Sequence, residues 1–162
     1  MRVLGIDPGL SATGYGMLVV NGKRERVAEA GVIRPAGSSL EARLCEIHEA
    51  VSEVLAEWQP EVLVIEEVYS KYRHPRTAIL MAHARGVICM AAGNRSMLVV
   101  DYAASEVRRA LTGNGRASGR QVREMVCRRL GISAGKQNEH MYDALALALC
   151  HAGRLREMKT GR

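Results

Sequence analysis

Apolar residues recur with two different spacings along this chain, and each spacing predicts a different kind of element. Short runs rich in Val, Ile and Leu predict buried strands, at Arg2–Asp7, 15–20, 26–33, 61–68 and 97–100. Apolar residues three and four positions apart predict helices, from about 37 to 59 and at 76–92, 103–111, 120–130 and 139–156. Three early strands followed by alternating helices and strands predict an α/β fold, in which helices flank a mixed five-stranded sheet.

Local turn and capping residues set some of the boundaries. Asn21-Gly22 suits a tight type I′ hairpin turn between the second and third strands. Ser38 and Glu41 have the spacing of a capping box at the start of the first helix. The helix at 76–92 is apolar on more than one side, so it can pack against the sheet and also against a second subunit.

The composition is typical of a globular protein, with 162 residues of which 48% are hydrophobic and 25% charged. This length predicts one domain, at residues 1–156, followed by a loose tail at 157–162. We expect neither a signal peptide nor a membrane span, because no uncharged apolar run reaches about 18 residues. The four cysteines are widely spread, which favours buried free thiols in a reducing compartment and predicts a cytoplasmic protein.

Charge is divided unevenly along the chain. The net charge is +6, and residues 71–129 hold 12 of the 23 Lys and Arg residues but only 3 of the 17 Asp and Glu residues. Residues 1–70 are acidic instead, with 6 Lys and Arg against 11 Asp and Glu. A long basic middle is typical of contact with a phosphate backbone. The alternative is a solvated basic face that has no partner.

Three carboxylates interrupt or end apolar elements. Asp7 follows the first strand, Glu66 follows Val-Leu-Val-Ile, and Asp143 directly precedes an Ala-Leu repeat. A carboxylate in such a place is costly to desolvate unless it is paired or coordinated. None has a Lys or Arg beside it in the sequence, so a hard divalent cation such as Mg²⁺ or Mn²⁺ is the simplest partner.

His140 lies three residues before Asp143, so on a helix the two share one face and can converge on one ion. Each residue also has a simpler interpretation. Asp7 precedes Pro-Gly and can be a turn residue, Glu66 can be a solvated charge at a strand end, His140 can face water, and Asp143 can be a first-turn acid favoured by the helix dipole. Together the four indicate a metal-dependent phosphodiesterase, since acids that hold two ions are a common means of cutting such bonds.

Several stretches resemble one family, the RuvC Holliday-junction resolvases of bacteria, in the expected order from residue 2 to about 153. They are Gly5-Ile-Asp7-Pro-Gly-Leu-Ser-Ala-Thr-Gly-Tyr-Gly16, Val64-Ile-Glu66-Glu-Val-Tyr69, Ala82-His-Ala-Arg-Gly86, Tyr102-Ala-Ala-Ser-Glu-Val-Arg108 and His140-Met-Tyr-Asp143-Ala-Leu-Ala-Leu-Ala.

The resemblance implies an RNase H-like fold and a homodimer that nicks four-way DNA junctions symmetrically during recombination and repair. The ends left would be 5′-phosphate and 3′-hydroxyl. It places the catalytic, metal-binding positions on Asp7, Glu66, His140 and Asp143, with two Mg²⁺ or Mn²⁺ ions per subunit. It also implies the branch-migration proteins RuvA and RuvB as partners.

The same resemblance suggests which residues contact DNA. They are Tyr69, Lys71, Arg73, Arg76, Arg108, Arg116 and Arg120. Tyr69 falls where the family has an aromatic residue at the junction centre, and Lys71 and Arg73 could follow a strand beside it. Many relatives have Lys where this chain has Gly119, so Arg116 or Arg120 is expected to replace it. Each could instead be an ordinary surface residue, and 70–76 a solvated loop.

Other functions remain open from the sequence. An RNase H-like nuclease acting on RNA–DNA hybrids is the nearest, and a junction-binding module without catalysis would not need Glu66, His140 and Asp143 together. The opening from Asp7-Pro-Gly to Gly14-Tyr-Gly could also be the phosphate loop of an actin-like ATPase. Such a protein would need a second domain of similar size, for which 162 residues leave no room. We therefore expect Gly9, Gly14 and Gly16 to permit the turn and close strand packing rather than to cradle a phosphate.

His140 leads to a prediction about metal choice, because many relatives have Asp there. A nitrogen ligand favours Mn²⁺ over Mg²⁺. Initial rates of junction cleavage should therefore be higher in Mn²⁺ than in Mg²⁺ at matched concentration, and equal or higher rates in Mg²⁺ would contradict the role given to His140.

Overall fold

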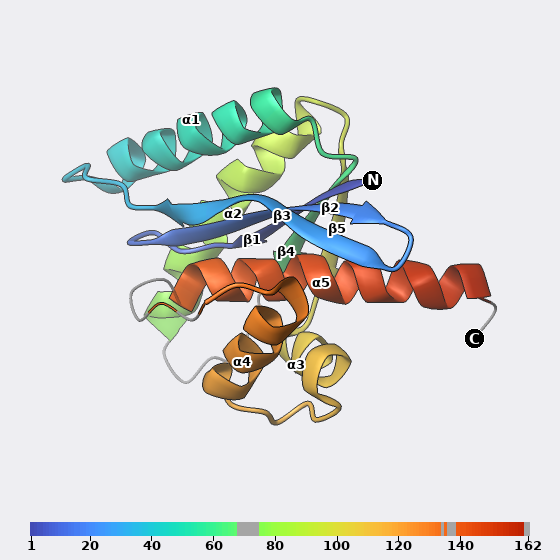
Figure 1. The fold of residues 1–162 in the computed structure, drawn as a ribbon. Helices are drawn as coiled ribbons and strands as arrows, with labels where there is room; N and C mark the ends of the chain where they lie inside the picture. The colour runs from blue at the N-terminus through green and yellow to red at the C-terminus, as the bar shows by residue number, and fades with distance from the viewer. Residues whose placement is uncertain (68–74, 134, 136–138, 161–162) are drawn as a thin grey trace.

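A five-stranded mixed sheet forms the middle layer of the molecule, as the sequence predicts (Figure 1). The computed structural model describes residues 1–67, 75–133, 135 and 139–160. The strand order is β3-β2-β1-β4-β5. β1 pairs antiparallel with β2 and parallel with β4, while β2–β3 is antiparallel and β4–β5 is parallel. The strands are β1 (Arg2–Asp7), β2 (Thr13–Asn21), β3 (Arg24–Ile33), β4 (Val62–Glu66) and β5 (Leu98–Tyr102).

Helices cover both faces of this sheet (Figure 1). One face carries α1 (Leu40–Trp58) and α2 (Pro75–Gly93). The other carries α3 (Ala104–Thr112), α4 (Gly119–Leu130) and α5 (Glu139–Thr160), and α5 lies directly on the strands. Each face has its own apolar core, so the sheet is buried on both sides in the manner of an α/β domain.

The alternation of side chains along the strands decides which face each acid meets. Leu4 and Ile6 belong to the core under α1 and α2, whereas Val3 belongs to the core under α5. Side chains two residues apart point to the same face of a strand, so Asp7 is on the α5 side. The same alternation in β4, where Val64 lies in the α5 core, places Glu66 on that side too.

Glycines let α5 approach the sheet closely. A Cβ atom at Gly5 would lie 2.0 Å from the backbone oxygen of Ala144, and one at Gly14 would lie 1.9 Å from that of His140. Because real Cβ contacts are never so short, the first turns of α5 can occupy this position only over glycine. Gly14 therefore permits close packing, as the sequence predicts, although the close partner is a helix rather than a strand.

Polar contacts hold the other end of α5. The hydroxyl of Tyr102 and Nδ1 of His151 form a buried hydrogen bond of 3.0 Å. Arg156 of α5 and Arg129 of α4 both pair with Glu25 of β3, whose side chain is only 6% exposed. The helix is thus tied to the sheet along its whole length.

Several boundaries differ from the sequence predictions. The N-cap of α1 is Ser39, whose hydroxyl accepts a hydrogen bond from the amide of Ala42, so the predicted capping role of Ser38 is wrong. The last helix continues to Thr160, so residues 157–160 are helical rather than loose, and 161–162 lie outside the described residues. The strand predicted at 61–68 ends at Glu66.

The hairpin and the cysteines are as predicted only in part. The β2–β3 hairpin turns where the sequence predicts, but Asn21 pairs with Arg24, so the two loop residues are Gly22 and Lys23. Gly22 has a φ of 59° and Lys23 does not have a positive φ, so the predicted type I′ turn, which requires positive φ at both central residues, is wrong. All four cysteines are free, as predicted, but only Cys150 is buried, while Cys89 and Cys127 are half-buried and Cys45 is exposed. Within the described ranges, no helix has the length and apolar character needed to cross a membrane.

The contact between Gly5 and Ala144 yields a stability test. Gly5→Ala should lower the free energy of unfolding by about 1–3 kcal/mol or more, because the added methyl group forces α5 away from the sheet. Chemical denaturation measures this change. The displacement of α5 should also slow the junction cleavage that the family resemblance implies. Gly93→Ala is the matched control, since nothing lies within 4 Å of its Cβ position. Equal effects of the two substitutions would contradict the proposed close approach.

Candidate active site

Two of the predicted acids lie side by side at the ends of neighbouring parallel strands. Ile6 of β1 is paired in register with Ile65 of β4, so Asp7 and Glu66 are the next residues on the two strands. Both face α5, as described above. Asp7 is buried, with 8% of its surface exposed, and Glu66 is half-buried. This placement follows from the parallel register alone.

The first turn of α5 brings the other two predicted residues to the same place. Nδ1 of His140 lies 2.8 Å from Oδ2 of Asp7, a hydrogen bond in which the ring N–H donates to the carboxylate oxygen. This bond, and the negative charges of Asp7 and Asp143, raise the pKa of His140. Asp143, one turn along the helix, lies at the opening of a cavity that it shares with Glu66.

This cavity, which we call the acid cavity, is about 130 Å³ and is lined by Glu66, Ala104, Val107, Arg108, Gly119, Val122, Asp143, Ala146 and Leu147. Burial, and then the charges of Asp7 and Asp143, raise the pKa of Glu66 to about 7. Surrounding protein, and then the charge of Asp7, raise the pKa of Asp143 to about 6, although this side chain also reaches solvent. The positive charge of Arg108, which also lines this cavity, opposes both shifts.

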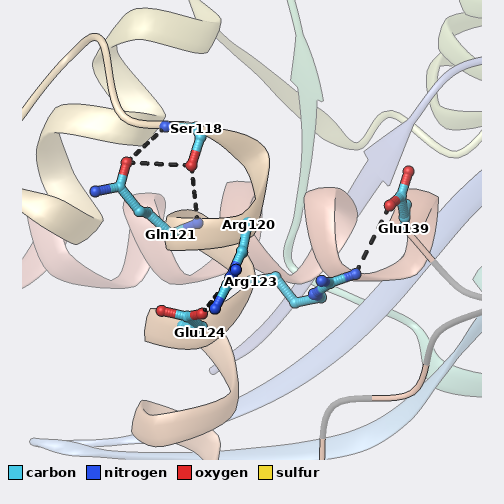
Figure 2. Close-up of polar contacts among 6 residues, drawn as sticks. All are labelled: Ser118, Arg120, Gln121, Arg123, Glu124 and Glu139. Atoms are coloured by element: carbon cyan, nitrogen blue, oxygen red, sulfur yellow. Dashed lines mark hydrogen bonds and ion pairs between the residues drawn. The ribbon is translucent and has the colours of Figure 1, made fainter.

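A second cavity adjoins the first and shares Gly119 and Asp143 with it. This arginine cavity, of about 120 Å³, is lined by Gly119, Arg120, Arg123, Glu139, Tyr142 and Asp143. Figure 2 shows Arg123 reaching from α4 toward Glu139 at the start of α5, while Arg120 lies along Glu124 of its own helix. The side chain of Ser118 accepts a hydrogen bond from the amide of Gln121 and fixes the start of α4 here.

The chemistry of these side chains fits a divalent cation. Among the described residues, no three His, Cys, Asp or Glu side chains lie close enough to share one ion as they stand. Yet Asp7, Glu66 and Asp143 repel one another strongly enough to raise two of their pKa values. A cation would relieve this repulsion, and carboxylate oxygens are the ligands that Mg²⁺ and Mn²⁺ prefer.

Of the predicted DNA contacts that the structure describes, Arg108 and Arg120 line the two cavities beside Asp143, whereas Arg76 and Arg116 line neither cavity. Arg76 is exposed in the first turn of α2, and Arg116 is exposed in the loop between α3 and α4. Arg120 forms an ion pair of 2.9 Å with Glu124. Tyr69, Lys71 and Arg73 lie outside the described residues.

Two further cations near the site escape sequence reasoning. Arg123 lines the arginine cavity, and the charge of Arg34, which follows β3, opposes the rise in the pKa of His140. Arg123 lies four residues after Gly119, so the two share one face of a helix, and this spacing is the feature of the sequence that could have identified Arg123. Nothing local marks Arg34, which comes near His140 only when the sheet forms.

The chain as a whole matches one family of proteins. The family model described as crossover junction endodeoxyribonuclease RuvC matches residues 3–151. The chain belongs to the RuvC family. A crossover junction endodeoxyribonuclease RuvC from Rhodopirellula baltica is 43% identical over 149 residues, which span 91% of this chain and 84% of that relative.

Solved structures agree with this RuvC assignment. The structure of T. thermophilus RuvC in complex with Holliday junction substrate matches with a TM-score of 0.89 and 34% identity, over 99% of this chain and 97% of that one. The yeast mitochondrial Holliday junction resolvase Ydc2 matches with a TM-score of 0.72 at 12% identity, over 98% of this chain and 80% of that one, a likeness of fold alone. The predicted RNase H-like fold is confirmed.

The raised pKa values predict how pH affects stability without divalent metal. Between about pH 4 and pH 7 the folded RuvC-family chain retains protons on Glu66 and Asp143 that the unfolded chain releases. The free energy of unfolding should therefore fall as pH rises through this window, and the raised pKa of His140 acts in the same direction. Thermal unfolding in a chelator across pH 4–8 measures the trend.

Substitution of Glu66 isolates its share of this effect. Glu66→Gln should raise the melting temperature at pH 8 by at least about 2–4 °C, the change that about 1 kcal/mol produces in a domain of this size. The gain should vanish near pH 4. Glu53→Gln, on an exposed part of α1, is the matched control and should show no such pH-dependent gain. A loss of stability in Glu66→Gln at pH 8 would contradict the repulsion described here.

Proposed function

We propose that this chain is an endonuclease that resolves four-way DNA (Holliday) junctions by paired symmetric nicks during recombination and repair. The observation that carries the proposal is the meeting of Asp7, Glu66, His140 and Asp143 from β1, β4 and α5 in a chain of the RuvC family. A relative at 34% identity has been solved with Holliday junction substrate, which supports the same substrate here.

We further propose that the reaction depends on two divalent ions per subunit, Mg²⁺ or Mn²⁺. The carboxylates of Asp7, Glu66 and Asp143 and the imidazole of His140 would hold them. When bound, such ions make water a stronger nucleophile and stabilise the leaving oxygen of a phosphodiester. The nitrogen of His140 supports the preference for Mn²⁺ given above. Hydrolysis of this kind leaves 5′-phosphate and 3′-hydroxyl ends.

Other side chains orient the ligands and the substrate. The hydrogen bond from His140 fixes one oxygen of Asp7, and burial restricts the carboxylate to one position. Arg108 opens onto the acid cavity beside Glu66 and Asp143. A guanidinium there can bind the phosphate that is to be cut, because its paired donors match phosphate oxygens. We propose weaker, sequence-independent contacts for Arg76, Arg116 and Arg120, and for Tyr69, Lys71 and Arg73.

Paired nicks need two active sites, so we propose a homodimer. α2 supports this proposal, because Ile79 and Met90 of this helix are 57% and 51% exposed while Ala84 and Ile88 are buried against the sheet. Large apolar residues exposed along one helix are typical of a surface that a partner covers. We also propose RuvA and RuvB as partners and the cytoplasm as the location, on the family resemblance.

A nuclease acting on RNA–DNA hybrids is the nearest alternative, since the acids alone do not select a junction. One experiment separates the two. The chain is incubated with a synthetic four-way junction, a linear duplex and an RNA–DNA hybrid, each in Mg²⁺ or Mn²⁺. Symmetric cleavage of the junction is expected, with little cleavage of the others. Preferential cleavage of the hybrid would refute the proposed substrate.

The role of Asp7 is tested by Asp7→Asn. This variant should bind the junction as tightly as the wild type in a gel-shift assay but should cut it at least about 10²-fold more slowly, because a ligand charge is lost. Asp101→Asn removes the same charge from an exposed aspartate of β5 and should cut normally. Retained cleavage by Asp7→Asn would refute the assignment of the site.

A further inference from the structure

Arg123 differs from the other arginines that line the two cavities, because the sequence gives it no role and its side chain is largely buried beside one of the catalytic acids. The arginine cavity contains Asp143, and it adjoins the acid cavity that holds Glu66 and Arg108. The side chain of Arg123 is 25% exposed, whereas that of Arg120 is 79% exposed. Both arginines line the cavity, but Arg123 is the more buried of the two.

The geometry of α4 directs Arg123 over Gly119. Side chains on a helix lean toward its N-terminus, so a residue covers the turn that precedes its own Cα. Arg123 is four residues after Gly119, and nothing lies within 4 Å of the Cβ position of Gly119. Gly119 therefore leaves space beside Asp143, and Arg123 borders this space with its guanidinium directed toward Glu139 of α5.

The guanidinium of Arg123 can bind a new partner, because its contact in the cavity is weak. Nη1 of Arg123 is 3.7 Å from Oε1 of Glu139, too far for a hydrogen bond, and the Glu139 side chain is 78% exposed (Figure 2). The hydroxyl of Tyr142 is already engaged, since it donates to the backbone oxygen of Ser133 and accepts from the amide of Gly135. Arg120 pairs with Glu124 at 2.9 Å.

We propose that Arg123 binds a phosphate of the DNA strand at the arginine cavity, which shares Asp143 with the cavity that Arg108 lines. This inference rests on the proposed function. A loose, solvent-exposed ion pair with Glu139 is worth little, whereas a guanidinium can bind a phosphate through two parallel hydrogen bonds. Arg123 exchanges Glu139 for the phosphate when DNA binds. The sequence predicts Arg116 or Arg120 for such a contact, and the structure favours Arg123 instead.

Two arginines from different helices would then hold the strand across the acids. Arg108 comes from α3 and Arg123 from α4, and each lines a cavity that includes Asp143. Arg108 and Arg123 would each hold a phosphate of the strand. The phosphate that is to be cut would therefore be restricted to the position of the ions. Loss of Arg123 should therefore weaken binding and also slow the cleavage of bound DNA.

The test compares Arg123→Gln with the wild type on a synthetic four-way junction. Junction affinity is measured in Ca²⁺ over a series of salt concentrations, and single-turnover cleavage is measured in Mn²⁺ at saturating protein. Arg123→Gln should bind about tenfold more weakly, the effect of losing a hydrogen bond to a charged group. The slope of log affinity against log salt should fall by about one, since one phosphate contact is removed. Arg123→Lys should recover part of the affinity.

Two control variants separate phosphate binding from a structural role. Arg128→Gln removes the same charge from an exposed position of α4 and should retain the salt slope and the cleavage rate. Glu139→Gln breaks the ion pair from its other side and should bind the junction at least as tightly as the wild type, since an acid near the phosphate is removed. An equal loss in Glu139→Gln and Arg123→Gln would show that the ion pair merely holds α5, and it would overturn the inference.

The outcome also distinguishes this inference from the proposed function. If the wild type cuts the junction and Arg123→Gln binds and cuts it equally well, the inference alone is wrong. If the wild type does not cut the junction in either metal, the proposed function is wrong and the inference fails with it. Melting temperatures of all variants confirm that each is folded.

Discussion

The close approach of α5 to β1 and β2 is the constraint on which the site depends. Asp7 is fixed in the sheet, and His140 reaches it only because the backbone of α5 rests on glycines at positions 5 and 14. A layer of ordinary side chains would place a helix about 10 Å from the sheet. Without that layer, the first turn of α5 comes near enough for a hydrogen bond of 2.8 Å between side chains of the two elements.

This approach has an electrostatic cost, because it gathers carboxylates in partly buried positions. The pKa values of Glu66 and Asp143 rise to about 7 and about 6, which shows that the folded chain disfavours their full ionisation. The core must offset this repulsion, and apolar packing on both faces of the sheet provides the stabilisation. Ionisable side chains with strongly shifted pKa values are typical of functional sites, where a bound ligand of opposite charge relieves the repulsion.

Much of the fold and the acid cluster could be predicted from the sequence because both depend on local patterns. The apolar runs locate every strand of the sheet, and strand alternation is enough to put Asp7 and Glu66 on one face. Ser38 and Ser39 are adjacent and chemically alike, so sequence alone does not decide which one caps α1. No Gly or Pro occurs at 154–160, so the sequence has no stop signal near the predicted end of this helix at 156.

The cationic part of the site was harder to predict, since arginines occur throughout the basic middle of the chain. Arg116, Arg120 and Arg123 are close in sequence, and their roles diverge only through tertiary structure. Arg120 and Arg123 line the same cavity, but Arg120 pairs with Glu124 of its own helix and is largely exposed, whereas Arg123 faces Glu139 of α5 and is largely buried. One of the family motifs includes Arg108. The position of Arg123 opposite α5 depends on tertiary contacts, so it can be recognised only in the folded structure.

The anchoring of α5 at both ends has a consequence for how this fold can vary. Asp7 holds the first turn through His140, while Tyr102 and Glu25 hold the later turns through His151 and Arg156. An α-helix turns by about 100° for each residue. One residue inserted between the two anchors would rotate His140 and Asp143 about 100° away from the strand ends, or would break the far contacts instead. The helix can therefore accept new side chains at its exposed positions, but its length between the anchors is fixed in register with the sheet.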